Sequence, residues 1–118
     1  MARITQSTAK IIAKLLQDKK AQNILVLDLR KAAFFTSFFV ICTGTSSPHL
    51  KALEENLMDT LKTKGYKRYG TEGTPESRWI LMDYGSIMIH IFEKERREYY
   101  NLERMWADAK IVWKSEED

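Results

Sequence analysis

WILMDYGSIMIHIF, residues 79–92, predicts a β-hairpin and therefore a sheet at the centre of the fold. Two short runs of strand-forming residues flank Tyr84-Gly85, and Gly85 can take the positive φ that a tight turn requires. With this turn, Trp79 lies opposite His90 and Met82 lies opposite Ile87. One face of the hairpin then carries only aliphatic side chains: Ile80, Met82, Ile87, Ile89 and Ile91.

The second face of the hairpin is mixed in character. It carries Trp79, Leu81, Asp83, Ser86, Met88 and His90. Large apolar side chains beside a few polar groups are typical of the core of an interface and unusual for the solvent face of a monomer. A partner therefore covers this face, or a helix or loop of the chain does, such as residues 30–35 (RKAAFF). In the second case His90 is a hydrogen-bonded core histidine and Trp79 only packs.

The flanking segments predict helices and strands in alternation. An amphipathic helix begins near hydroxyl caps in residues 5–7, and two strands, 24–29 and 38–43, follow with an irregular loop between them. Ser47 is a suitable N-cap for a second helix, Pro48 its first residue, and Gly65 its left-handed C-terminal cap.

The remaining segments complete one domain, residues 1–118. We expect a short strand at 66–69, a polar loop, the hairpin, and a last helix over about 94–112 followed by a polar tail that frays. The helix between the second and third strands predicts a parallel crossover, whereas the hairpin adds antiparallel pairs. The fold class is α+β, with a mixed sheet of about five strands and helices mainly on one face.

Composition favours a soluble globular protein of the cytoplasm. The net charge of +3 is mild, Cys42 is the only cysteine, and no apolar run approaches the roughly 20 residues that cross a bilayer. The N-terminus has neither the apolar core nor the cleavage site of a signal peptide.

The sequence contains no convincing catalytic or metal-binding pattern, and we expect no cofactor. Asp28, Asp83 and His90 lack the spacing of metal ligands, and Cys42 has no adjacent base. The TGTSS turn at 43–47 could cradle a phosphate, but a capping role explains it and the lysine of a Walker-type loop is absent. Basic residues at 62–68 could touch RNA without reading it, yet the aromatic-plus-basic stripe of a single-strand reader is missing.

Four segments resemble the ribosomal silencing factor (RsfS/Iojap) family. They are TSFFVICTGTSSPHL (36–50), Glu72-Gly73, WILMDYGSIMIHIF (79–92) and ERREYYNLERMW (95–106). The resemblance implies a non-enzymatic translation repressor with a fold distantly similar to nucleotidyltransferases. Such a factor binds a conserved protein on the intersubunit face of the large ribosomal subunit, number fourteen in the standard series. The bound factor blocks joining of the small subunit under nutrient limitation. A free homodimer is plausible, and a nucleotide-binding protein or enzyme is the alternative.

The resemblance also indicates the partner-binding residues. The positions that match the family are Glu72, Gly73, Trp79, Asp83, Gly85, His90, Tyr100, Leu102, Glu103 and Trp106. Ser37 and Ser86 stand where the family usually has aspartates, which removes two possible charged contacts. We expect Trp79, Leu81, Met88 and His90 at the centre of a docking surface, with Asp83, Tyr84 and Ser86 at its rim.

Overall fold

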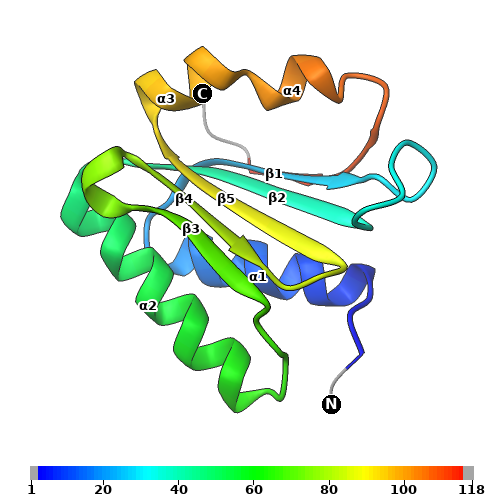
Figure 1. Cartoon of the computed structure of the whole chain (residues 1–118), viewed down its shortest axis with the longest axis horizontal. Coiled ribbons are helices and arrows are strands. Elements are labelled where there is room, and N and C mark those ends of the chain that lie inside the picture. Colours follow the sequence, from blue (N-terminus) through cyan, green and yellow to red (C-terminus); the bar gives the residue numbers. More distant parts are fainter. Residues whose placement is uncertain (1–2, 116–118) are drawn as a thin grey trace.

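The computed structural model describes residues 3–115 and contains one six-stranded mixed sheet, in the order β3-β4-β5-β2-β1-β6 (Figure 1). The α+β class with a mixed sheet is confirmed, with six strands instead of about five. The elements are α1 (Gln6–Asp18), β1 (Gln22–Asp28), β2 (Phe38–Gly44), α2 (Ser47–Thr63), β3 (Gly70–Thr74), the 3-10 turn η1 (Pro75–Ser77), β4 (Trp79–Asp83), β5 (Ile87–Glu93), α3 (Lys94–Tyr100), α4 (Leu102–Met105) and β6 (Lys110–Lys114).

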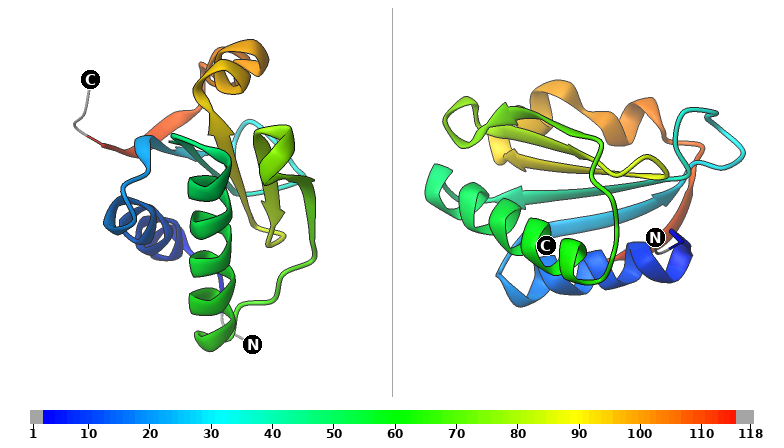
Figure 2. Two further views of the ribbon diagram at one scale, coloured as in Figure 1. Left: turned by 90° about the vertical axis from the view of Figure 1, so that its left-hand side faces the viewer. Right: turned by 60° about the horizontal axis from the view of Figure 1, so that its bottom comes forward.

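The two long helices, α1 and α2, lie on the same face of the sheet (Figures 1 and 2). Thr5 caps α1 as predicted, and Ser46, one residue before the predicted cap, accepts from the N–H of His49 at the start of α2. The core on this face includes the aliphatic side of the hairpin, whose five side chains are fully buried. Each such side chain stabilises the fold by roughly 1.5–3 kcal/mol.

The hairpin has the predicted faces but a different register. Met82 pairs with Ile89 and Leu81 with His90, because the turn centres on Gly85-Ser86 and not on Tyr84-Gly85. Moving the turn by one residue shifts the pairing by two. Side chains alternate with a period of two, so a two-residue shift leaves each side chain on its own face.

The crossover through α2 connects parallel strands that are not neighbours. β2 pairs in parallel with β5, and β3 lies at the edge of the sheet, antiparallel to β4. The predicted strand at 66–69 is wrong by about four residues. The TEGT part of the expected polar loop forms β3 instead, since Gly70 pairs with Asp83 and Thr74 pairs with Trp79.

The predicted last helix over 94–112 is also wrong. It is replaced by two short helices, α3 and α4, which lie across the second face of the sheet, and by β6 (Figure 1). Asn101 between α3 and α4 has a left-handed φ of 47°, which ends the first helix. β6 pairs with β1, with Ile111 opposite Leu27 and Trp113 opposite Val26, and Val112 lies at the register shift between these two pairs. Of the polar tail predicted to fray, residues 116–118 lie outside the described residues.

Candidate docking surface

Part of the second face of the sheet remains accessible beside α3. Trp79, Leu81, Asp83 and Met88 are half-buried there, and we call these four residues the outer strip. β4 and β5 place them next to one another, since Asp83 is the register partner of Met88 and Leu81 that of His90. Three large apolar side chains and one carboxylate therefore share a single rigid surface.

Trp79 is held between an edge strand and a short helix. Its ring lies 6.3 Å from that of Tyr100, centroid to centroid, and contacts Gly73 on β3. Gly73 has a φ of +78°, and a Cβ there would collide with the backbone carbonyl of Trp79 and lie 2.8 Å from its indole ring. The indole can occupy this position only because residue 73 is a glycine and has no side chain.

We expect Gly73→Ala to lower the free energy of unfolding by about 2–4 kcal/mol, because alanine must adopt a left-handed conformation and its Cβ would collide with the backbone carbonyl of Trp79. The matched control is Gly70→Ala on the same strand, where a Cβ would meet nothing within 4 Å and φ is not positive. Urea unfolding followed by circular dichroism measures both variants. Equal stability of the two variants would contradict the role assigned to Gly73.

The three predicted rim residues do not lie together. The Oδ1 of Asp83 accepts a 2.8 Å hydrogen bond from the backbone N–H of Gly85, which braces the turn. Ser86 is exposed at the turn itself. Tyr84 is buried, with 3% of its surface exposed, and belongs to the core beneath α1 and α2. The structure thus places Tyr84 on the other side of the sheet from the outer strip.

His90 is buried among aromatic rings. Its ring packs edge-on against Phe39 at 4.6 Å between centroids and stacks on Phe92 at 5.9 Å. Within residues 3–115 neither ring nitrogen has a hydrogen-bond partner. Removal from water penalises the charged imidazolium and lowers the pKa of His90 to about 4, so the ring is neutral at pH 7.

The chain covers this part of the face with its own C-terminal segment. Trp106 packs against Phe39 at 5.9 Å and against Phe35 at 5.9 Å, so the loop 30–37 contributes Phe35 to the cover, while Phe34 remains fully exposed. The chain itself therefore covers part of this face, and coverage of the rest by a partner stays a prediction. His90 is covered internally but is not hydrogen-bonded, whereas the outer strip beside it remains accessible.

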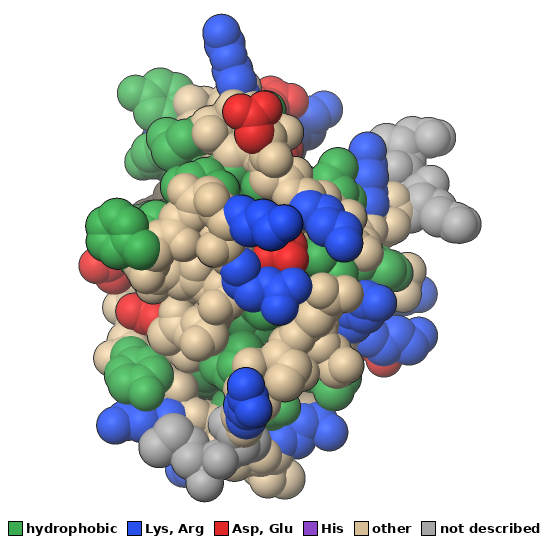
Figure 3. All heavy atoms as spheres, turned by 90° about the vertical axis from the view of Figure 1, so that its right-hand side faces the viewer, with side chains coloured by type: hydrophobic (Ala, Val, Ile, Leu, Met, Phe, Trp, Pro, Cys, Tyr) green, Lys and Arg blue, Asp and Glu red, His purple; other side chains and the backbone are tan. Residues whose placement is uncertain are grey.

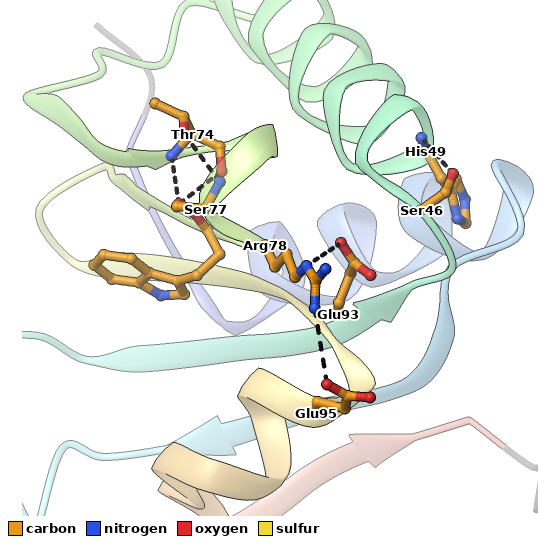
Figure 4. A network of polar contacts seen from close by, with 8 residues as sticks. Ser46, His49, Thr74, Ser77, Arg78, Glu93 and Glu95 are labelled. Carbon is orange, nitrogen blue, oxygen red and sulfur yellow. Dashed lines mark hydrogen bonds and ion pairs between the residues drawn. The ribbon is translucent and has the colours of Figure 1, made fainter.

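Polar contacts hold the cover in addition to the packing of Leu102, Trp106 and Ala109 on the second face. No residue of α3 or α4 is buried. Arg97 on α3 donates to the Oγ1 of Thr43 at 2.9 Å and pairs with Glu103 at 3.2 Å. Arg78, which precedes β4, lies within 3.9 Å of Glu93 and 3.8 Å of Glu95, and so links the start of the hairpin to the start of α3 (Figure 4).

The remaining candidates for chemistry have structural roles. Cys42 is fully buried, and desolvation raises the pKa of its thiol to about 12. At the TGTSS turn, the Nδ1 of His49 accepts from the N–H of Thr45 at 3.0 Å, and its Nε2 donates to the carbonyl of Lys19 at 2.9 Å. Residues 3–115 contain no group of three His, Cys, Asp or Glu side chains that could hold a metal ion.

The model of the family described as "Ribosomal silencing factor during starvation" matches residues 2–118. The chain belongs to the ribosomal silencing factor family. It is 37% identical over 107 residues to the ribosomal silencing factor RsfS of Bacillus subtilis, which covers 91% of each chain. The chloroplastic protein Iojap of Zea mays is 32% identical over 87% of this chain and 45% of its own length. The resemblance found in the sequence is therefore confirmed.

Two solved structures of bacterial proteins share this fold. A crystal structure of a Chromobacterium violaceum protein superposes with a TM-score of 0.84 at 30% identity, over 89% of this chain and 88% of the other. A Bacillus halodurans structure superposes with a TM-score of 0.77 at 31% identity, over 86% and 95%. Within the described residues, no helix is long and apolar enough to span a bilayer.

Proposed function

We propose that this ribosomal silencing factor is a non-enzymatic translation repressor that docks on the large ribosomal subunit. Its partner is the conserved intersubunit-face protein, number fourteen of the large-subunit series. The bound factor sterically blocks joining of the small subunit in the cytoplasm when nutrients are limited. The observation that carries the proposal is the outer strip, three large apolar side chains beside Asp83 that the C-terminal cover leaves accessible.

The outer strip has the chemistry of an interface centre. Tryptophan and methionine are enriched in interface cores. Truncation of an interface tryptophan to alanine commonly costs more binding energy than truncation of the residues around it. Asp83 gives the strip a carboxylate for a basic partner, although one of its oxygens already accepts from Gly85. An interface of standard size would bury roughly 1,200–2,000 Å² in total, so the docking surface must extend beyond the four residues.

A homodimer of the free protein would use the same apolar surface. Dimerisation would then compete with docking, because a strip covered by a second copy cannot contact the ribosome. Sedimentation equilibrium over a range of protein concentrations gives the dimerisation constant, and subunit binding is then measured at concentrations below and above it. We expect subunit binding to weaken under conditions in which the dimer predominates.

The test of the proposed function is co-sedimentation of the protein with isolated large subunits, isolated small subunits and joined ribosomes. We expect it to migrate with large subunits, to be absent from small subunits, and to reduce the joined fraction when both subunits are mixed. Migration with small subunits, or binding that leaves joining unchanged, would overturn the proposal. Absence from all three particles would overturn it as well.

A further inference from the structure

A groove of about 570 Å³ opens at the end of the molecule where the loop 30–37 meets the β4–β5 turn. Both segments lie on the right of Figure 1, and Figure 3 views this end directly. We call it the end groove. Segments distant in the sequence line it, and the residues used below are Arg30, Phe34, Phe35, Lys67, Tyr69 and Gly85.

The end groove presents aromatic rings to solvent. Phe34 is fully exposed, Tyr69 is 60% exposed and Phe35 is 46% exposed. The rings of Phe34 and Phe35 lie edge to face with centroids 6.4 Å apart. Exposed aromatic faces are costly to leave in water, and each of them can stack on a planar ligand.

The backbone under these rings is well ordered by hydrogen bonds. The Oγ1 of Thr36 donates to the carbonyl of Gly85 at 3.0 Å, and the carbonyl of Ser86 accepts from the N–H of Ser37 at 2.9 Å. A Cβ on Gly85 would lie 3.1 Å from the ring of Tyr69, so that ring rests directly on the turn. The ring of Tyr69 and the turn beneath it are therefore held in place, which reduces the entropy that this part of the groove loses when a ligand binds.

The charge of the end groove is positive. Arg30 and Lys67 line it, and among residues 3–115 no aspartate or glutamate belongs to its lining. The ammonium of Lys67 lies 5.1 Å from the ring centroid of Tyr69, whereas Arg30 is already paired with Asp28 at 2.7 Å. Lysine and arginine side chains gather over the middle of this end of the molecule (Figure 3). Lys67 therefore lies beside an exposed ring and is more available to a phosphate than Arg30, which is paired with Asp28.

We propose that the end groove binds an unpaired segment of RNA. Bases stack on Phe34 and Tyr69, and phosphates lie near Lys67. Rings and cations together fit a single strand, since an acidic peptide would use the cations without the rings and an apolar peptide would not need the cations. A duplex is excluded from stacking because its bases are already stacked on one another.

The inference rests on the proposed function, because it supplies a second contact for the same docking event. The end groove and the outer strip meet at the β4–β5 turn, where Asp83 belongs to the strip and Ser86 lines the groove. A factor seated on a ribosomal protein through the strip would present the groove to neighbouring ribosomal RNA.

The experiment measures fluorescence anisotropy of a labelled, unstructured 12-nucleotide RNA and of a duplex of the same sequence, from 25 to 200 mM salt. For the single strand at low salt we expect a Kd of roughly 10–100 µM, and weaker binding of the duplex. Phe34→Ala should weaken single-strand binding roughly tenfold. Lys67→Gln should reduce the slope of log K against log salt by about 0.7.

Two matched variants serve as controls. Tyr99→Ala removes an exposed aromatic on α3, and Lys51→Gln removes an exposed cation on α2, both outside the groove lining. Neither control should change RNA binding. All four variants should have the melting temperature of the wild type, because the side chains that they replace are exposed. No single-strand binding, or binding insensitive to Phe34→Ala, overturns the inference. A labelled poly-glutamate peptide bound with the same sensitivity to Phe34→Ala overturns it in favour of an acidic protein.

Failure of the inference and failure of the proposed function are distinguishable with Trp79→Ala. This variant should keep single-strand binding and lose co-sedimentation with large subunits. Wild-type protein that binds large subunits but no RNA leaves the proposed function standing and overturns the end groove. Wild-type protein that binds RNA through Phe34 but does not bind large subunits overturns the proposed function and leaves the RNA-binding end groove standing.

Discussion

Trp79→Ala lowers the affinity for the large ribosomal subunit by roughly 30- to 1,000-fold, the effect of about 2–4 kcal/mol at the centre of an interface. The indole is the largest side chain of the outer strip and is only half-buried in the free protein. In the free protein the indole also packs on Tyr100, Gly73 and the apolar cluster of the second face, so the free energy of unfolding falls by about 1–3 kcal/mol. Depletion of the protein by increasing amounts of sedimented large subunits measures the affinity.

Ile111→Ala is the matched control for this variant. Ile111 is an apolar residue, 56% exposed, on β6 at the opposite edge of the sheet from β3 and β4. Its truncation should leave the affinity within about twofold of wild type. Unchanged affinity of Trp79→Ala would remove the outer strip from the docking surface. A collapse of the melting temperature in parallel with binding would show that the indole serves packing alone.

His90 makes the fold sensitive to acid. Its pKa is about 4 in the folded protein and about 6.5 when the chain is unfolded, so the unfolded state binds more protons between these two values. The free energy of unfolding is therefore not reduced by protonation of His90 above pH 6.5. It falls as the pH drops from 6.5 towards 4, by about 3 kcal/mol over this whole range. The C-terminal cover over His90 has few buried contacts, and we expect it to separate first.

His90→Leu removes this sensitivity. Leucine has a similar volume and brings no unpaired polar atom into the aromatic cluster, so the variant should be about 1–3 kcal/mol more stable than wild type at pH 7. Urea unfolding of both proteins at intervals from pH 7 to pH 4.5 gives the difference. Glu54, whose pKa is raised by burial, and Asp28, whose pKa is lowered by its hydrogen bond to Arg30, are common to both proteins and cancel. Parallel pH profiles would contradict the assignment to His90.

The residues of the outer strip could be placed from the sequence where strand alternation alone decided their position. Trp79, Leu81, Asp83 and Met88 share the expected face, since any register that differs by two keeps them together. Tyr84 is misplaced by the predicted turn at Tyr84-Gly85, because in the structure its N–H still pairs with the carbonyl of Ile87 and its side chain shares the buried face of Ile80 and Met82. Its burial depends on the space that α1 and α2 leave beneath the turn.

The sequence by itself determined the features that depend on near neighbours along the chain. These are the two faces of the hairpin, the N-cap of α1 within residues 5–7, the N-cap of α2 to within one residue, and the left-handed Gly65 after α2. Only the tertiary structure decided what depends on distant partners. Residues 110–114 became β6 because the exposed edge of β1 offered them backbone hydrogen bonds. The same long-range packing placed Trp106 on Phe39, which contacts the buried His90. It also brought Phe34 and Tyr69, 35 positions apart in the sequence, to the lining of one groove.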